Sequence, residues 1–411
     1  MNNVLTFIDL FAGAGGLSEG FVRAGFRPVA HVEADESACA TLTTRLVFQH
    51  LKETKTESKY LDYLQGKIDR KTFWDELSPE LRRSVIHEEI SENSIHRIYS
   101  QIDKQLGGNQ VDLIIGGPPC QAYSLIGRSR DPKRMVGDAR NYLFRFYSSF
   151  LRRYKPSFFV FENVLGLLTA GNQVYLKKML ISFRKAGYTA DFKVLNSEDF
   201  GVLQRRRRVI VIGQRDNQNF EFPAFETRES NWQLKDALLA DLPPLQPGQE
   251  LKISKYTMPC NDYLKDSEIR NGHSFTSQHI ARPHNARDLE IYSIAISRWL
   301  ESRSRLKYDE LPKRLRTHKN IDGFLDRFKV VNPFGFSHTV VAHIAKDGHY
   351  YIYPDSDQVR SISVREAARI QSFPDDFYFE GGRTAAYRQI GNAVPPLMAQ
   401  AISKWIKAQF D

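Results

Sequence analysis

The chain has 411 residues, enough for two or three domains at roughly 150 residues each. Hydrophobic residues make up 41% and charged residues 26%, an ordinary globular composition that excludes a disordered tail protein, a collagen-like rod and a coiled coil. Lys and Arg total 58 against 48 Asp and Glu, so the net charge of +10 favours a polyanionic partner, most often nucleic acid.

The cysteines and the N-terminal residues indicate the cellular environment. Cys39, Cys120 and Cys260 form no CxxC pair, so we expect a reducing compartment, no disulfide framework and no metal site. No apolar run approaches the roughly 20 residues of a membrane helix, and the N-terminus lacks the features of a secretory signal. These patterns predict a cytoplasmic protein without a membrane partner.

The first predicted elements form a strand–turn–helix–strand unit. Residues 6–10 are a short apolar strand, residues 11–16 a Gly-rich turn, residues 17–24 an amphipathic helix and residues 29–33 a second strand. This order is typical of dinucleotide-binding, Rossmann-like α/β domains. Residues 49–88 are highly charged, and we interpret them as a partly helical insertion between core elements.

Three short apolar runs follow, at residues 111–117, 157–162 and 209–213, and they predict buried parallel strands, with a helix over 140–154. Prolines then interrupt the chain, so residues 214–363 are expected to form a smaller, irregular domain. Residues 364–372 and 397–410 are predicted helices. The expected organisation is therefore a catalytic domain over 1–213, a second domain over 214–363, and a C-terminal segment, 364–411, that returns to the first.

The Gly-rich turn is a candidate ligand site. Glycine lets the backbone approach a ligand closely, and the following helix offers free N–H groups. Glu33 lies twenty residues beyond Gly13 and could accept hydrogen bonds from ribose hydroxyls. The full GxGxxG spacing is missing, so an adenosine ligand with an amino-acid tail fits better than a pyrophosphate cofactor. A tight turn with a surface acid is the alternative.

Cys120 is the most distinctive candidate for chemistry. It follows a predicted strand through Gly116, Gly117, Pro118 and Pro119, and two prolines fix the direction of the next side chain. A single cysteine is most often an inert core residue. A cysteine at the C-terminal end of a strand, beside a ligand crevice, is instead a candidate nucleophile.

Two further groups end or precede strands. Glu162 ends an apolar run and would face the same crevice as Cys120 if both strands are parallel, while the next residue, Asn163, could also cap a helix. In the basic run 204–208, alternation places Arg206 and Arg208 on one face. A solvated basic segment is the alternative interpretation of this run.

Taken together, these motifs resemble those of the bacterial-type DNA cytosine-5 methyltransferases. The matching blocks occur in the order of that family and extend from Phe11 to Pro396. They read FAGAGGLSEGF, VEAD, GGPPCQAYS, FENV, QRRRRVIVIG, REAARIQSFP and RQIGNAVPP. The resemblance implies a Rossmann-like S-adenosylmethionine-dependent domain, and it identifies residues 214–363 with the family's variable target-recognition region.

The resemblance also implies a catalytic mechanism. Cys120 would add as a thiolate to carbon 6 of cytosine, so that carbon 5 can attack a methyl sulfonium. Glu162 would act on ring nitrogen 3, Arg208 would contact the carbonyl oxygen of the base, and Arg206 would lie in the active-site neighbourhood. The base would be flipped out of the duplex, and a loop over residues 124–140 would close over it.

Ligand contacts are implied in the same way. The implied S-adenosylmethionine site comprises Phe11, Gly13, Gly15, Gly16, Glu33, Glu89, Pro118, Asn392 and Val394. The implied DNA contacts are Gln121, Ser124, Arg128 and Arg130. Ala34 departs from the bulky aromatic residue that often follows the acid in this family, and Glu89-Ile90 replaces its usual Asp-Ile pair.

The sequence therefore predicts a sequence-specific DNA (cytosine-5) methyltransferase. It would act as a monomer on duplex DNA, beside a cognate restriction endonuclease or as an orphan enzyme. A tRNA methyltransferase on the same scaffold is one alternative, which the long region between the Arg run and REAARIQSFP disfavours. A catalytically inactive DNA-binding homologue is another, which Cys120, Glu162 and Arg208 disfavour.

Overall fold

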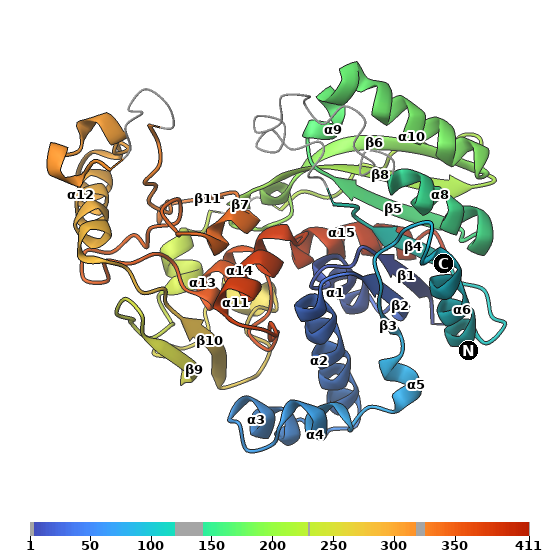
Figure 1. Cartoon of the computed structure of the whole chain (residues 1–411), viewed down its shortest axis with the longest axis horizontal. Coiled ribbons are helices and arrows are strands. Elements are labelled where there is room, and N and C mark those ends of the chain that lie inside the picture. The colour runs from blue at the N-terminus through green and yellow to red at the C-terminus, as the bar shows by residue number, and fades with distance from the viewer. Residues whose placement is uncertain (1–3, 120–142, 229–230, 318–324, 411) are drawn as a thin grey trace.

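The computed structural model describes residues 4–119, 143–228, 231–317 and 325–410 (Figure 1). Its centre is a seven-stranded sheet with the strand order β3-β2-β1-β4-β5-β8-β6. The strands are β1 (Thr6–Leu10), β2 (Arg27–Glu33), β3 (Val85–His87), β4 (Leu113–Gly116), β5 (Phe158–Asn163), β6 (Tyr188–Asn196) and β8 (Arg207–Arg215). The first five run parallel, which confirms the predicted α/β class.

One predicted strand has the other direction. Residues 209–213 lie in β8, which is antiparallel to both β5 and β6, so their assignment as a parallel strand is wrong. The connection explains the direction: β6 reaches β8 through residues 197–206, and a parallel pair needs a crossover of about a dozen residues or more. The run is continuously apolar because the sheet is covered on both faces there.

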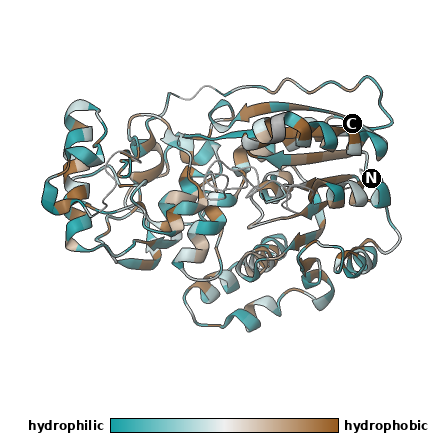
Figure 2. Ribbon diagram, turned by 45° about the horizontal axis from the view of Figure 1, so that its top comes forward, coloured by the Kyte–Doolittle hydropathy of each residue, from teal (hydrophilic) through white to brown (hydrophobic). Residues whose placement is uncertain are grey.

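Helices cover the two faces of the sheet, and successive strand residues point to opposite faces. Phe7 of β1 belongs to the core formed with α1 and α15, whereas Ile8 belongs to the core formed with α6, α8 and α10. Figure 2 shows hydrophobic residues along the central strands. The helices are α1 (Gly16–Arg23), α6 (Ile95–Leu106), α8 (Leu143–Tyr154), α9 (Gly166–Thr169), α10 (Val174–Lys185) and α15 (Pro396–Lys407).

The charged insertion is helical and has an apolar core of its own. It continues α2 (Glu36–Glu53) and contains α3 (Ser58–Leu64), α4 (Arg70–Trp74) and α5 (Pro79–Arg82). Buried Tyr60 and Phe73 pack with Phe48 of α2, and Ile253 and Phe275 of the second part of the chain lie against them. The insertion therefore joins the sheet domain to the β9–β10 hairpin described next.

The region after residue 214 contains two separate hydrophobic cores. Its elements are β9 (Glu250–Lys255), α11 (Asp262–Asp266), β10 (Phe275–Ile280), α12 (Ala286–Ser302) and β11 (Ser337–His338), which pairs with β7 (Gln204–Arg205). One core is shared with α13 (Val364–Ile370) and α14 (Arg383–Asn392). The other holds α12 to residues 306–315 and 328–330, and we name residues 286–317 and 325–330 the helical lobe.

None of the helices in the described part of the chain combines the length and apolar character needed to span a bilayer.

Candidate active site

The sheet brings three predicted site segments to one edge. β1, β4 and β5 are parallel neighbours, with Leu10 in register with Gly116 and Gly116 in register with Phe161. The segments that follow these strands therefore start at the same edge. These segments are the Gly-rich turn after β1, Gly117 after β4, and Glu162 with Asn163 at the end of β5.

At this edge Glu162 and Arg208 form an ion pair. The Arg208 Nε lies 2.7 Å from Glu162 Oε1, and each side chain is 12% exposed. β8 runs beside β5 with Ile210 opposite Glu162, so the register places the two side chains within reach. The structure thus brings together two of the four predicted catalytic residues. Such a pair holds the carboxylate in one orientation toward the edge.

Gly117 lies against the carboxylate of Glu162. A Cβ at Gly117 would come within 2.6 Å of Glu162 Oε2, so any larger residue would displace the carboxylate. Pro118 is buried, and its carbonyl oxygen accepts a hydrogen bond of 3.4 Å from Asn163 Nδ2. Asn163 Oδ1 also accepts from the backbone N–H of Val164. Asn163 is the last residue of β5, and the N-cap of α9 is Leu165, which makes no side-chain cap bond, so the alternative role of Asn163 as a helix cap is wrong.

Cys120, the predicted nucleophile, lies outside the described residues. The same holds for the predicted DNA contacts Gln121, Ser124, Arg128 and Arg130. Pro119 is the last described residue before them and is exposed. These assignments remain predictions from the sequence.

Arg206 occupies a different environment from Arg208. Both have interior positions while Arg205 and Arg207 are exposed, which confirms the predicted alternation. Arg206 is completely buried, and its guanidinium donates to the carbonyl oxygens of Val340 at 2.6 Å and Gly391 at 3.1 Å. Arg206 therefore fastens the start of β8 to two distant segments, whereas Arg208 reaches Glu162.

The Gly-rich turn is held open by Glu33. Gly13 donates its N–H to Glu33 Oε2 at 2.7 Å, and the N–H groups of Ala34 and Asp35 donate to Oε1 at 2.8 Å each. Gly13 has a φ of 55° and Gly15 one of 82°, a region that favours glycine. A Cβ at Gly13 would meet nothing within 4 Å, so the turn leaves space on that side.

The C-terminal segment closes the other side of this turn. A Cβ at Gly16 would come within 2.4 Å of the Val394 carbonyl oxygen, so glycine is required for their contact. Gln371 Nε2 holds the segment in place by donating to the carbonyl of Ala393 at 2.8 Å. Asn392, at the end of α14, is exposed. Val394, a predicted ligand residue far along the chain, thus adjoins the turn, and Asn392 precedes it by two residues.

Glu89 lies near this site but outside the sheet. β3 ends at His87, which is in register with Glu33, so Glu89 lies two residues beyond the end of this strand. Its side chain is exposed, and its carbonyl oxygen accepts a hydrogen bond from Ser94 Oγ. The acid is therefore at the same edge of the sheet as Glu33, with no element holding its side chain.

One buried acid was not predicted as a site residue. Asp9 of β1 is 1% exposed, and within the described residues neither carboxylate oxygen has a hydrogen-bond donor. Burial, and then the nearby charge of Glu33, raise the pKa of Asp9 well above its usual range. The available signal was a single acid within an otherwise apolar strand, which is rarely a structural choice.

The geometry at the Gly-rich turn fits S-adenosylmethionine. Glu33 still has acceptor capacity beyond its three backbone donors, since a carboxylate offers about four sites. Helix α1 begins at Gly16 without a side-chain cap, so its first N–H groups remain available to a ligand. In the part of the chain that is described, no group of three or more His, Cys, Asp and Glu residues is arranged to hold a metal ion.

The site lies at one edge of a seven-stranded α/β sheet. It combines a Gly-rich turn, an acid placed to bind ribose hydroxyls and a Glu–Arg ion pair. These features indicate a nucleotide-dependent group-transfer fold. The family model for C-5 cytosine-specific DNA methylase matches residues 5–69 and 82–408. The chain belongs to this family. The gap in the match, residues 70–81, falls in the insertion.

Relatives with similar sequences are methyltransferases of restriction–modification systems. Type II methyltransferase M.Bpa9945I of Bacillus paralicheniformis is 44% identical, over 97% of this chain and 98% of the relative. Type II methyltransferase M.DdeI of Desulfomicrobium norvegicum is 31% identical, over 99% of this chain and 89% of the relative.

Solved structures share the fold across the whole chain. A prophage-encoded DNA modification methyltransferase from E. coli is similar with a TM-score of 0.65 and 22% identity, over 99% of both chains. The methyltransferase EhMeth of Entamoeba histolytica has a TM-score of 0.57 and 15% identity, over 100% of both chains. At these identities the likeness extends to the fold alone.

Proposed function

We propose that this protein transfers a methyl group from S-adenosylmethionine to carbon 5 of a cytosine within a short sequence of duplex DNA, the reaction of DNA (cytosine-5-)-methyltransferases. The observation that carries the proposal is the Glu162–Arg208 pair, which faces Gly117 at the sheet edge that also holds the Gly-rich turn. The names of the relatives, type II methyltransferases, support DNA as the substrate.

The residues divide the chemistry between them. The Cys120 thiolate forms a bond to carbon 6 of the flipped cytosine, and the electron pair of the 5,6 double bond becomes available at carbon 5. Glu162 donates a hydrogen bond or a proton at ring nitrogen 3, where negative charge would otherwise build. After transfer, a base, which could be water, removes the hydrogen on carbon 5, and the thiolate leaves as the double bond reforms.

Arg208 orients this carboxyl group. It binds Oε1 of Glu162 and leaves Oε2 on the Gly117 side, toward the start of the segment that carries Cys120. The bound donor supplies an electrophilic methyl sulfonium. Glu33 would hold its ribose, Gly13 and Gly15 would allow close approach of its amino-acid tail, and Asn392 and Val394 would close the site from the C-terminal segment.

We further propose which parts of the chain carry catalysis and target recognition, and with which partners the protein acts. Residues 1–213 and 364–411 would carry catalysis and residues 214–363 target recognition. The protein would act as a cytoplasmic monomer, since methylation of one flipped base needs no two-fold axis. The restriction–modification names of its relatives favour a cognate endonuclease that cuts the same sequence.

Bisulfite sequencing tests the proposal directly. DNA from a host free of cytosine methylation, expressing this chain, should contain protected cytosines in one recurring short context. The matched Cys120→Ser variant should leave no protected cytosine and still bind DNA. Protection that persists in the variant would refute the thiolate mechanism. Soluble wild-type protein that protects no cytosine would refute the DNA substrate and direct the assay to tRNA.

A further inference from the structure

Among the residues that the structure describes, two cations near the junction of the helical lobe and β11 form no ion pair. Lys329 lies between Phe328 and Val330, which are both buried in the lobe core. Lys329 is half-buried, and Arg305 nearby is exposed. Across the described ranges of the chain, no carboxylate lies within ion-pair distance of either side chain. Burying an ammonium group without an anion costs free energy.

The pKa values of Lys329 and His338 indicate a positive electrostatic potential at this junction. Burial, with a smaller contribution from Arg305, lowers the pKa of Lys329 to about 8, and Asp326 acts in the opposite direction. Burial, then Lys329 and Arg305, lower the pKa of His338 to about 3. His338 is therefore neutral at physiological pH, with Nε2 donating to the carbonyl oxygen of Tyr350 at 2.5 Å.

His338 links these cations to the basic run. It lies in β11, in register with Arg205 of β7, so the two residues are lateral neighbours. Arg205 is 69% exposed and its guanidinium lies over the ring of Phe336 at 5.6 Å, while Arg207 is also exposed. Glu198 pairs with Arg205 at 2.9 Å. We name Arg205, Arg207, Arg305 and Lys329 the junction patch.

Arg205 joins the junction patch to the catalytic pair. Arg205 is three residues from Arg208, and an extended chain spans at most about 3.5 Å per residue, so the two Cα atoms are within roughly 11 Å. A DNA strand presents one phosphate for about every 3.4 Å of helix axis. Phosphates a few steps from a base at Glu162 are therefore within reach. In Figure 1, β7 and β11 lie between α12 and β8.

We propose that Lys329 and Arg305, together with Arg205 and Arg207, bind the backbone phosphates beside the target cytosine. This inference rests on the proposed function, because it takes duplex DNA as the ligand. The phosphates would pair with the positive charges of Lys329 and Arg305. These contacts would position the bound strand relative to Glu162 without recognising its base sequence.

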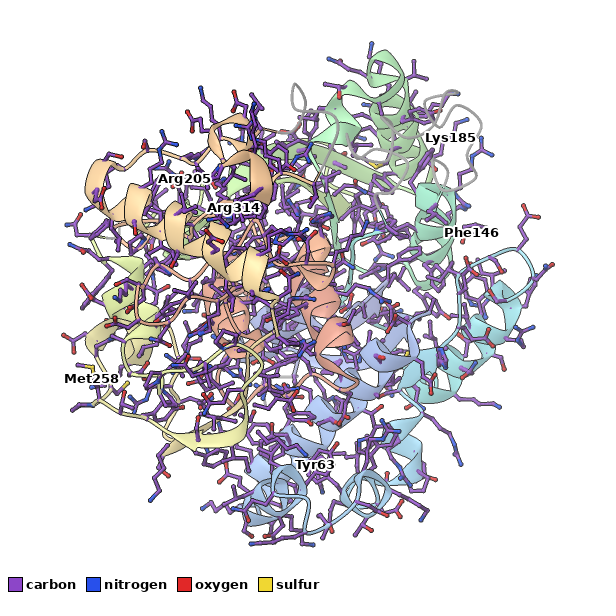
Figure 3. The ribbon with its side chains drawn as sticks, turned by 60° about the vertical axis from the view of Figure 1, so that its left-hand side comes forward. Tyr63, Phe146, Lys185, Arg205, Met258 and Arg314 are labelled. Atoms are coloured by element: carbon purple, nitrogen blue, oxygen red, sulfur yellow. The ribbon has the colours of Figure 1, made fainter. Side chains whose placement is uncertain are left out.

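The salt dependence of DNA binding tests the patch. Binding of a fluorescein-labelled duplex of arbitrary sequence is measured across salt concentrations for the wild type, Lys329→Gln and Arg305→Gln. Each variant should lower the slope of log affinity against log salt by about 0.9, the value for one phosphate contact. Lys71→Gln is the matched control, because Lys71 is 85% exposed on α4 in the insertion. Figure 3 shows Tyr63 of this insertion at the bottom of the view and Arg205 in the upper left part.

The pH dependence gives a second measurement, specific to Lys329. Above about pH 8 free Lys329 loses its proton, so wild-type affinity should fall by up to about tenfold per pH unit. Lys329→Arg should abolish this fall and keep the wild-type salt slope. Of the other groups facing this region, Arg305 and Asp326 are exposed, His338 titrates near pH 3 and Tyr350 near pH 12.

Three outcomes are distinguishable. Reduced slopes in Lys329→Gln and Arg305→Gln, with unchanged melting temperature and S-adenosylmethionine binding, support the patch. Unchanged slopes with the same folded behaviour overturn it and leave the proposed function standing. A wild type that binds no duplex DNA at low salt overturns both.

Discussion

The carboxylate of Glu162 depends on a neighbour that has no side chain. Arg208 holds one of its oxygens, and Gly117 leaves room for the other. The sequence predicted Glu162 and Arg208 from their places at strand ends, but the role of Gly117 needs the distance between two strands. Alternation likewise predicted a shared face for Arg206 and Arg208, yet their partners differ because each reaches a different distant segment.

This arrangement predicts that Gly117→Ala damages catalysis more than folding. The new Cβ, 2.6 Å from Oε2, must push the Glu162 carboxylate away from its position. We expect kcat to fall by about 100-fold, the effect of losing a positioned proton donor, with DNA affinity retained. Methyl incorporation under single-turnover conditions measures this loss.

Gly382→Ala is the matched control, because a Cβ there meets nothing within 4 Å. It should keep wild-type kcat and lower the unfolding free energy by about 1 kcal/mol at most, because Gly382 is the N-cap of α14 and alanine is disfavoured there. Normal turnover by Gly117→Ala would mean that Glu162 acts from another position than the one observed.

Among the elements, the apolar strands were predictable and the amphipathic or irregular ones were not. β1, β4 and β5 are buried runs whose pattern identifies them. β6 alternates between half-buried and exposed residues at the sheet edge, so no apolar run marks it. The direction of β8 depends on the length of its connection rather than on its composition. In the region 214–363 the prolines concealed α12 and the β9–β10 hairpin.

The two cores of that region predict which exchange of segments will transfer specificity. The helical lobe has its own core, whereas Leu234, Leu238 and Val340 pack with α13 and α14. Replacing 286–330 by the corresponding segment of a relative with another target should change the methylated context and keep the melting temperature within a few degrees. Replacing all of 214–363 should lower it, because the shared core is cut.

Bisulfite sequencing and thermal melting of both chimaeras measure these effects. If the folded chimaera with residues 286–330 replaced still methylates the wild-type sequence context, target recognition lies in residues 214–285 or 331–363 instead.

At the scale of the whole molecule, buried histidines make the fold sensitive to acid. Burial lowers the pKa of His31 and His279 to about 4 each, below the 6.5 of an unfolded chain. The unfolded state therefore takes up protons first, and stability present above about pH 6.5 is lost as the pH falls toward 4. Each histidine should contribute a slope of about 1.4 kcal/mol per pH unit in this window.

Urea unfolding between pH 7 and pH 5 measures this slope. His31→Gln should reduce this slope by the contribution of one histidine, about 1.4 kcal/mol per pH unit. His96→Gln, at an exposed position on α6, should leave the slope unchanged. A stability that stays constant over this range would contradict the burial of both rings in the neutral form.

The last helix of the chain completes the core of its first strand. Met398, Ile402 and Ile406 of α15 share a core with Phe7 and Phe21, and Ser403 Oγ donates to the carbonyl of Gly20 across 383 residues of sequence. During synthesis the α1 face of the sheet therefore stays uncovered until α15 has been translated. Nascent chains and products of premature termination that stop before α15 would lack this cover, and the core around Phe7 and Phe21 would stay open to solvent.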